Sequence, residues 1–440
     1  MKTQIFKFIL SLFLGFYSFF GKAQSLYFPP SFSLTWDTIQ PSTLGWCQSK
    51  VDTLTNYVGN TNAKAFILLK NGKIVIEKYY GTFTVDSMWF WASAGKSLAA
   101  VMIGRAEQDG LINLNDSTSK YLGSGWTVST PQQEKLITVK EQLKMTSGLN
   151  DALTDPDCTI DTCLQYLANA GTRWAYHNAP YNLLHDLLEN ASGLTLQQYT
   201  NQKIKTPIGM STGFWFDHVF YSRARDMARF GLLALANGNW NGNMVVNNST
   251  FINDMKNTSN PYNLAYGYLW WLNGKSSCMV PQSQLVFPGS LIPNAPSDMY
   301  CALGKYDQKI YVVPSQNLVV VRMGQSATTN ALALSTYDNV LWQRISDLTC
   351  TVGFNESVKQ TLNIFPNPSN KIIYLEGIDF SNSKTVVVTD MLGKEIKLSI
   401  TQIQNNKAQL DISSLTEGIY LLQINDVRKK MVVSSNIKPF

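Results

Sequence analysis

The chain has 440 residues, of which 45% are hydrophobic and 15% charged, so it can build a large core and is not a disordered protein. Its 36 basic and 30 acidic residues leave a net charge of +6 without any long basic run. Nucleic-acid-binding proteins gather Lys and Arg into patches, so this distribution gives no indication of a nucleic-acid partner. A chain of this length is expected to form about two or three folded units.

The N-terminus has the three parts of a secretory signal peptide. Lys2 and Lys7 precede an apolar stretch, and a small-residue pattern that ends at Ala23 follows it. This order predicts that residues 1–23 are removed and that the mature chain is exported. The apolar stretch is too short for a membrane span and no later stretch is long enough, so we expect no stable membrane span.

Helical and strand-like patterns then alternate in an order typical of an α+β domain. The expected elements are a helix over 43–57, a β-hairpin of 65–69 and 73–77, helical stretches from 96 to about 235, strands over 265–272, 299–303, 309–313 and 318–322, and a helix over 332–347. Strands at both ends with helices between them predict one domain over 24–350, whose sheet joins the N- and C-terminal parts.

The pattern of polar and apolar residues changes after Cys350. Residues 351–361 have the character of a linker, and short alternating or apolar runs separated by turns fill 362–440. Such runs, without a helical period, predict a small β-sandwich.

The six cysteines all precede residue 351, and an exported chain tolerates disulfides. The possible pairings are a local bridge of Cys158 with Cys163, a mid-length loop closed by Cys278 with Cys301, and a link between the domain's ends by Cys47 with Cys350. The sequence leaves this connectivity open. Zinc is the alternative, but the three histidines have no ligand spacing with the cysteines, so we expect neither a metal nor a cofactor.

A serine and a lysine three residues apart can form a nucleophile and its base. Four such pairs occur: Ser93/Lys96, Ser117/Lys120, Ser381/Lys384 and Ser435/Lys438. Only Ser93 is flanked by buried-type sequence on both sides, because an aromatic run precedes it and an apolar helical run follows. The second pair begins in a polar, loop-like run, and the last two lie in the C-terminal region. Context therefore selects Ser93 and Lys96.

A helix that begins near Ser93 places its hydroxyl and the Lys96 amine on one face, and its N-terminus lies ready to stabilise an oxyanion. Lys96 can take the serine proton only if its pKa is lowered or a tyrosine shares the proton. Tyr176 is the candidate for this relay, and the Asn178 amide for orienting the lysine and a substrate carbonyl. His177, between them, is expected to be exposed and to point away, and the alternative is that it tunes Tyr176 or contacts the substrate.

Ser93-x-x-Lys96 followed by Tyr176-x-Asn178 resembles the serine hydrolases of the class C β-lactamase and penicillin-binding protein group, in particular their esterase and 6-aminohexanoate-oligomer hydrolase branch. The resemblance covers roughly residues 43–347. It implies a β-lactamase/transpeptidase-like domain, in which helices flank an antiparallel sheet and a helical subdomain is added. Further similar segments lie at 137–149, 206–210 and 225–231.

The third element of that family is a strand that reads Lys or His, any residue, Gly. Its best match here is Ala302-Leu303-Gly304, and the resemblance implies that the backbone N–H groups of Lys305 and Ser93 form the oxyanion hole. In β-lactam enzymes the cation of this strand helps to hold the substrate carboxylate, and Ala302 replaces it. This favours an ester- or amide-cleaving enzyme acting on a small-molecule or peptide-like substrate. A β-lactamase or D-amino-acid-specific peptidase of the same fold is one alternative, and an inactive secreted binding protein is another.

A Gly-x-Ser-x-Gly run at 209–213 also matches the nucleophile elbow of α/β-hydrolases. That elbow needs a buried strand before the serine and a helix after it, and neither is expected here. We therefore prefer Ser93 over Ser211 as the nucleophile.

The C-terminal region resembles the sorting domain of the type IX secretion system. The similar segments are Phe365-Pro366-Asn367-Pro368, 388–395, 415–420 and a basic strand near Lys429 and Lys430. The resemblance implies recognition by the type IX machinery and passage across an outer membrane to the cell surface or the medium.

Overall fold

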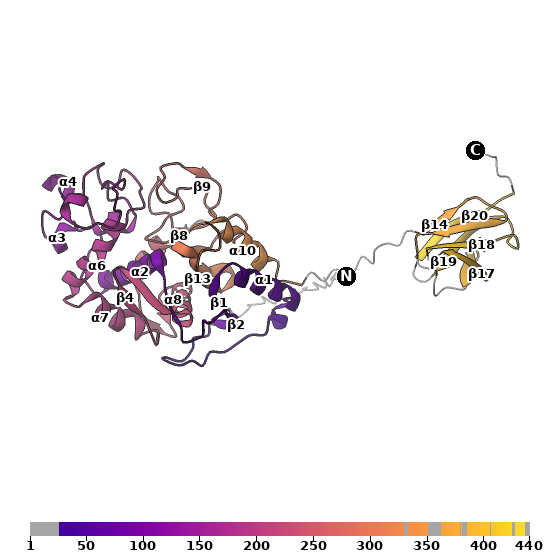
Figure 1. Cartoon of the computed structure of the whole chain (residues 1–440), viewed down its shortest axis with the longest axis horizontal. Coiled ribbons are helices and arrows are strands. Elements are labelled where there is room, and N and C mark those ends of the chain that lie inside the picture. Colours follow the sequence, from indigo (N-terminus) through magenta and orange to yellow (C-terminus); the bar gives the residue numbers. More distant parts are fainter. Residues whose placement is uncertain are drawn as a thin grey trace, which may run out of the picture. The chain divides into compact units, whose positions relative to one another are not determined.

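The computed structural model describes residues 26–329, 333–350, 362–378, 380, 385–404, 406–424 and 427–435 (Figure 1). The chain forms two compact units that divide after Cys350. The predicted signal peptide and the predicted linker lie outside the described residues. Within the described ranges, no helix is long and apolar enough to cross a membrane.

A six-stranded antiparallel sheet forms the centre of the first unit. Its strands, in spatial order, are β2 (Lys73–Tyr79), β1 (Ala63–Lys70), β13 (Leu318–Gly324), β12 (Gln308–Val313), β11 (Tyr300–Gly304) and β8 (Trp271–Leu272). Because β1 pairs with β13, from Ala63 opposite Gly324 to Lys70 opposite Leu318, the sheet joins the two ends of the unit.

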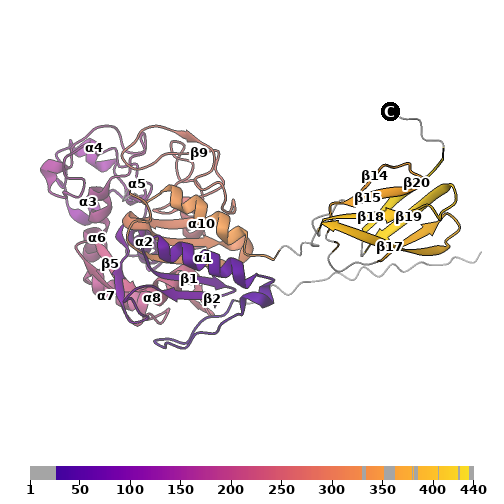
Figure 2. The ribbon, with the colours of Figure 1, turned by 45° about the vertical axis from the view of Figure 1, so that its right-hand side comes forward.

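Helices cover both faces of this sheet. On one face, α1 (Gln48–Asn60) packs against α10 (Thr336–Ser346), and Figure 2 shows these two helices side by side in front of the strands. On the other face lies α8 (Ala224–Leu235), which packs against β13, β12 and β1. Neighbouring residues of β12 divide between the two faces, because Ile310 lies against α8 whereas Tyr311 meets Trp342 of α10. The sheet is therefore buried on both sides.

A mainly helical part lies between β2 and β8. Its helices are α2 (Gly95–Gln108), α3 (Ser119–Leu122), α4 (Pro131–Lys135), α5 (Val139–Leu143), α6 (Asn178–Ser192), α7 (Leu196–Thr200) and α9 (Ser249–Met255). A three-stranded sheet of β3 (Met88–Phe90), β5 (Val219–Arg223) and β4 (Phe214–Phe216) interrupts them. Two strand pairs, β6 (Asn239–Trp240) with β7 (Asn243–Met244) and β9 (Ser277–Cys278) with β10 (Phe287–Pro288), complete the unit.

The strand predicted over 265–272 is mostly wrong, since only Trp271 and Leu272 belong to β8. Leu269 has a φ of 56°, which breaks an extended chain, and the Gly267 N–H donates to the Trp270 carbonyl in a turn. The segment is apolar because it is buried, and burial alone does not distinguish a turn from a strand.

Two disulfides occur among the described residues. Cys47 joins Cys350, with Cα atoms 4.9 Å apart, and Cys158 joins Cys163, with Cα atoms 5.9 Å apart. The pairing of Cys278 with Cys301 is wrong, because both are free, buried thiols. Cys301 pairs with Tyr311 and Trp271 inside the central sheet, whereas Cys278 belongs to the separate β9–β10 pair.

The second unit is the predicted β-sandwich. Its strands follow the order β14 (Asn363–Phe365), β15 (Ile372–Glu376), β18 (Lys407–Asp411), β17 (Glu395–Gln404), β16 (Thr385–Asp390), β19 (Gly418–Ile424) and β20 (Val427–Val433). The long strand β17 pairs with β16 over 395–399 and with β18 over 400–404, so it links the two halves. Ile373, Leu375, Leu410 and Leu422 lie fully buried between them.

Candidate active site

Ser93 lies on a sharp turn between β3 and α2. A short helix, η2 (Ala92–Ala94), runs directly into α2, so the helix begins where the sequence predicts it. Ala92 has a φ of 46°, a left-handed conformation that is uncommon for a residue other than glycine. The turn is held on its strand side, where the Trp91 N–H donates to the Phe220 carbonyl over 2.8 Å. Ser93 is thereby presented at a helix N-terminus.

Lys96 reaches back to this serine. Its Nζ lies 3.3 Å from Ser93 Oγ, 4.1 Å from the centre of the Tyr181 ring and 5.4 Å from that of Tyr176. The side chain is buried, and this desolvation lowers the pKa of Lys96 to about 7, while the negative charge of Asp157 acts in the opposite direction. An amine with a pKa of about 7 is substantially unprotonated at neutral pH, so Lys96 can accept a proton there.

Tyr176 completes a three-residue cluster. Its hydroxyl is hydrogen-bonded to Ser93, and burial raises the pKa of Tyr176 well above its ordinary value. The ring stacks on Trp271 with centroids 5.8 Å apart and planes 18° apart. A tyrosine with a raised pKa keeps its proton at neutral pH and can donate it, whereas the lysine beside it can take one.

Asn178 and His177 occupy the start of α6 and the position before it. The Oδ1 atom of Asn178 is buried and has no hydrogen-bond partner among the described residues. His177 is not exposed as expected, because only 2% of it is accessible and neither ring nitrogen is paired in the described part of the chain. Burial lowers the pKa of His177 to about 4, so it is a neutral side chain next to Tyr176.

The end of β11 approaches Ser93 through Gly304. A Cβ on Gly304 would stand 2.3 Å from the Trp91 carbonyl oxygen and 3.0 Å from the Ala94 nitrogen, so only glycine permits this contact. Lys305 is the next residue and begins the turn after the strand. Ala302 lies two residues earlier on the same face of β11 and is fully buried.

The competing motifs that the structure describes in full do not form such a cluster. The Lys120 ammonium is paired with Asp116 over 2.6 Å, and Ser381 and Lys384 lie outside the described residues, as does Lys438. Around Ser211, the backbone N–H donates to Asp226 over 2.9 Å, and strand β4 follows where an elbow needs a helix.

Sequence reasoning missed Tyr181 as a neighbour of Lys96. The sequence feature that could have identified Tyr181 is its position three residues after Asn178, because this spacing places both side chains on one face of α6. Aromatic rings also surround Tyr176, since the centre of its ring lies 6.3 Å from that of Tyr266 and 6.4 Å from that of Trp174. In the described ranges, no group of three or more His, Cys, Asp or Glu side chains is placed to hold a metal.

Comparison with known families agrees with this geometry. Residues 54–341 match the Beta-lactamase family, and residues 363–438 match the Secretion system C-terminal sorting domain. The chain therefore belongs to the β-lactamase family, and its first unit is a serine hydrolase of the β-lactamase/transpeptidase-like fold. Its second unit is a sorting domain that marks proteins for export by the type IX secretion system.

Individual relatives are distant. An uncharacterized protein of Alkalihalophilus pseudofirmus is 24% identical over 309 residues, which cover 61% of this chain and 85% of that protein. Protein flp of Staphylococcus aureus is 25% identical over 186 residues, which cover only 37% of each protein.

Among solved structures, a protein assigned as a 6-aminohexanoate-dimer hydrolase of Bacillus anthracis has a TM-score of 0.54 at 18% identity, over 74% of this chain and 88% of its own. EstCE1, a hydrolase with promiscuous acyltransferase activity, has a TM-score of 0.51 at 12% identity, over 68% and 99%. At such identities the similarity concerns the fold.

Proposed function

We propose that the first unit cleaves an ester or amide by two-step acyl transfer on Ser93. The observation that carries this proposal is the 3.3 Å contact between Ser93 Oγ and the amine of Lys96, whose pKa burial lowers to about 7. Lys96 takes the hydroxyl proton while Oγ bonds to the substrate carbonyl carbon. Tyr176 gives its proton to the leaving oxygen or nitrogen and regains one from Lys96. Water then attacks the acyl-enzyme, and Ser93 recovers its proton as the acid is released.

The oxyanion of each tetrahedral intermediate would be held by the backbone N–H groups of Ser93 and Lys305. Support comes from the close approach of Gly304 to the Ser93 turn and from the helix N-terminus at that turn. Asn178 would orient the lysine and a substrate carbonyl through its amide, whose oxygen has no hydrogen-bond partner among the described residues.

The residues near the proposed active site favour a substrate that carries an apolar group over one that carries a carboxylate. The strand cation of β-lactam enzymes is replaced by Ala302. Gln284 contacts the segment that carries Tyr176, since its Nε2 donates to the Trp174 carbonyl over 3.2 Å. The next three residues, Leu285, Val286 and Phe287, are 67%, 57% and 42% exposed. We call this exposed apolar run the apolar lip. These features support an esterase or amidase over a β-lactamase or D-amino-acid-specific peptidase.

A fluorophosphonate probe tests the proposed nucleophile. The purified protein should form one covalent adduct, located at Ser93 by peptide mass spectrometry, and Ser93→Ala should remove both the adduct and turnover while leaving the fold intact. Ser211→Ala is the matched control and should label normally. A folded wild-type protein without an adduct at Ser93 would support the inactive binding protein instead.

Comparison of p-nitrophenyl esters, D-amino-acid amides and nitrocefin would define the substrate class. We expect turnover of esters with apolar acyl groups and little turnover of nitrocefin. Faster turnover of nitrocefin or of the D-amino-acid amides would overturn the esterase assignment without affecting the role of Ser93.

We further propose that residues 1–23 are removed on export, that 24–350 form the hydrolase, and that 351–361 link it to the sorting domain of 362–440. Support comes from the division of the chain after Cys350 and from the sorting-domain match at 363–438. The intact mass of the secreted protein tests the expected N-terminus, which follows Ala23, and shows whether the chain still extends to residue 440.

A further inference from the structure

The turn that carries the proposed second oxyanion donor has an unusual backbone. It is the short helix η5 (Lys305–Asp307), in which Tyr306 and Asp307 have φ values of 62° and 58°. Residues other than glycine rarely adopt this left-handed conformation, and two in succession are held only where the surroundings impose them. The position of the Lys305 N–H therefore depends on whatever fixes this turn.

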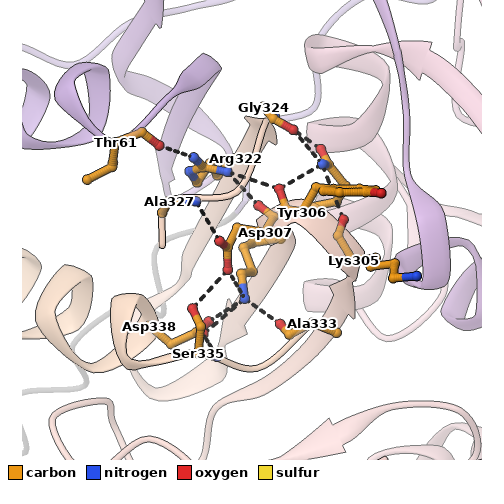
Figure 3. A network of polar contacts seen from close by, with 12 residues as sticks. Thr61, Lys305, Tyr306, Asp307, Arg322, Gly324, Ala327, Ala333, Ser335 and Asp338 are labelled. Carbon is orange, nitrogen blue, oxygen red and sulfur yellow. Dashed lines mark hydrogen bonds and ion pairs between the residues drawn. The ribbon is translucent and has the colours of Figure 1, made fainter. Parts of the chain in front are cut away.

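A buried cluster of charges lies directly beneath it (Figure 3). The Asp307 carboxylate accepts from the Ala327 N–H over 2.8 Å and from the Ser335 hydroxyl over 3.0 Å, and it pairs with Lys309 over 3.1 Å. Lys309 also pairs with Asp338 over 2.9 Å. All three charged side chains are fully buried, so water does not compete for these contacts.

Arg322 of β13 holds the backbone of the same turn. Its guanidinium donates to the Asp307 carbonyl over 2.9 Å and to the Gln325 carbonyl over 2.9 Å, and it also donates to the Thr61 carbonyl. With Arg322 included, the cluster has two carboxylates and two cations, so its charge is balanced.

The turn is tied as well to the strand that leads to Ser93. Gln308 Nε2 donates to the Tyr306 carbonyl over 2.9 Å and to the Gly324 carbonyl over 2.6 Å. The Trp89 indole of β3 donates to the same Gly324 carbonyl over 3.2 Å. The Tyr306 ring packs on Phe90 with centroids 5.9 Å apart. One carbonyl thus connects both segments of the proposed oxyanion hole.

We propose that Asp307 is a positioning residue for the oxyanion hole, acting through the turn that places the Lys305 N–H opposite Ser93. The proposal rests on the acyl-transfer function proposed above. Its carboxylate anchors the turn to the segment before α10 through Ala327 and Ser335, while its own backbone forms part of the turn. Asp338 belongs to the same cluster, but its backbone lies in α10.

The pair Asp307→Asn and Asp338→Asn separates positioning from stability. Each variant keeps side-chain size and removes one buried carboxylate charge from Lys309, so both should lower Tm. Only Asp307→Asn should displace the oxyanion donor, and misplacement of such a group costs on the order of 10²-fold in kcat with little change in KM. Asp338→Asn should keep kcat within about threefold of wild type at a temperature where both are folded.

The affinity for a boronic acid inhibitor is a second measurement, and a loss of stability alone does not change it. Its adduct with Ser93 is tetrahedral, so affinity should fall in Asp307→Asn by about the same factor as kcat/KM, and little in Asp338→Asn. Equal losses of kcat in the two variants, or an unchanged kcat in Asp307→Asn, would overturn the proposal.

If Asp307→Asn does not fold, Ser335→Ala replaces it, because that change keeps the Asp307 carboxylate and removes one of its hydrogen bonds. The same change also removes a 3.5 Å contact with Asp338 and the serine of the α10 capping box, so Asp338→Asn remains its control. We expect a loss of about fivefold in kcat, and an unchanged kcat would overturn the proposal. A wild-type protein that fails to label at Ser93 would instead overturn the proposed function, so the two failures are distinguishable.

Discussion

Lys96 and Lys309 are both buried lysines of the same unit, but the charges around them differ. The Lys96 amine faces the Ser93 hydroxyl and two aromatic rings, and no carboxylate of the described residues pairs with it. The Lys309 ammonium contacts Asp307 over 3.1 Å and Asp338 over 2.9 Å. Burial therefore has two outcomes: without a contacting carboxylate it lowers the lysine pKa, as the proposed role of Lys96 as a base requires, and with two carboxylates it makes a structural ion cluster.

Between the two lysines, the larger expected effect on turnover is that of Lys96→Met, which keeps side-chain length and removes the amine. We expect kcat to fall on the order of 10³-fold, because Ser93 loses the group that takes its proton. Thermal unfolding should show no loss of Tm, because Lys96 forms no ion pair with any of the described residues. Turnover within tenfold of wild type would contradict the role of Lys96 as base. A large loss of Tm would show that Lys96, like Lys309, contributes to stability.

Lys309→Met should lower the stability of the unit, which Lys96→Met should not do. It leaves two buried carboxylates without their shared cation, which should lower the free energy of unfolding by about 3–5 kcal/mol. Urea denaturation measures this, and Lys73→Met is the control, since the Lys73–Asp37 pair is 37% and 49% exposed and its loss should cost less than about 1 kcal/mol. Similar losses in the two variants would mean that the buried cluster is not a special source of stability.

The smallest expected effect concerns the apolar lip. Leu285→Ser should raise KM for long-chain esters by about threefold and leave acetate esters unchanged, because only a long acyl group would reach the lip. Leu136→Ser is the control, since Leu136 is a comparably exposed leucine at 50%. If KM rises equally for acetate and long-chain esters, the lip does not select the acyl group.

The difference between the two lysines also shows which parts of the molecule could be predicted from the sequence. Ser93 and Lys96 are three residues apart at a helix start, so local spacing brings them together, and Tyr176 with Asn178 follows a recognisable motif. The order and pattern of the elements predicted an α+β domain followed by a small β-sandwich, whereas the β-lactamase-like fold and the sorting domain were predicted from the resemblance of short segments to those families. Both were confirmed.

The ion cluster was not predictable in this way. Asp307, Lys309 and Asp338 come from a turn, a strand and a helix, and only the tertiary fold brings their charges into contact. The same reason explains the wrong pairing of Cys278 with Cys301, because their separation in the sequence gives no information about which sheet holds each thiol.

The most direct test of the central claim is the pH dependence of Ser93 acylation by a fluorophosphonate. Burial lowers the pKa of Lys96 from 10.5 to about 7, and the base is active only when unprotonated. The acylation rate should therefore rise with pH and reach half its maximum near pH 7, and this transition should be absent from the residual rate of Lys96→Met. A midpoint near the ordinary lysine pKa, or the same profile in Lys96→Met, would contradict the assignment of Lys96 as the buried base.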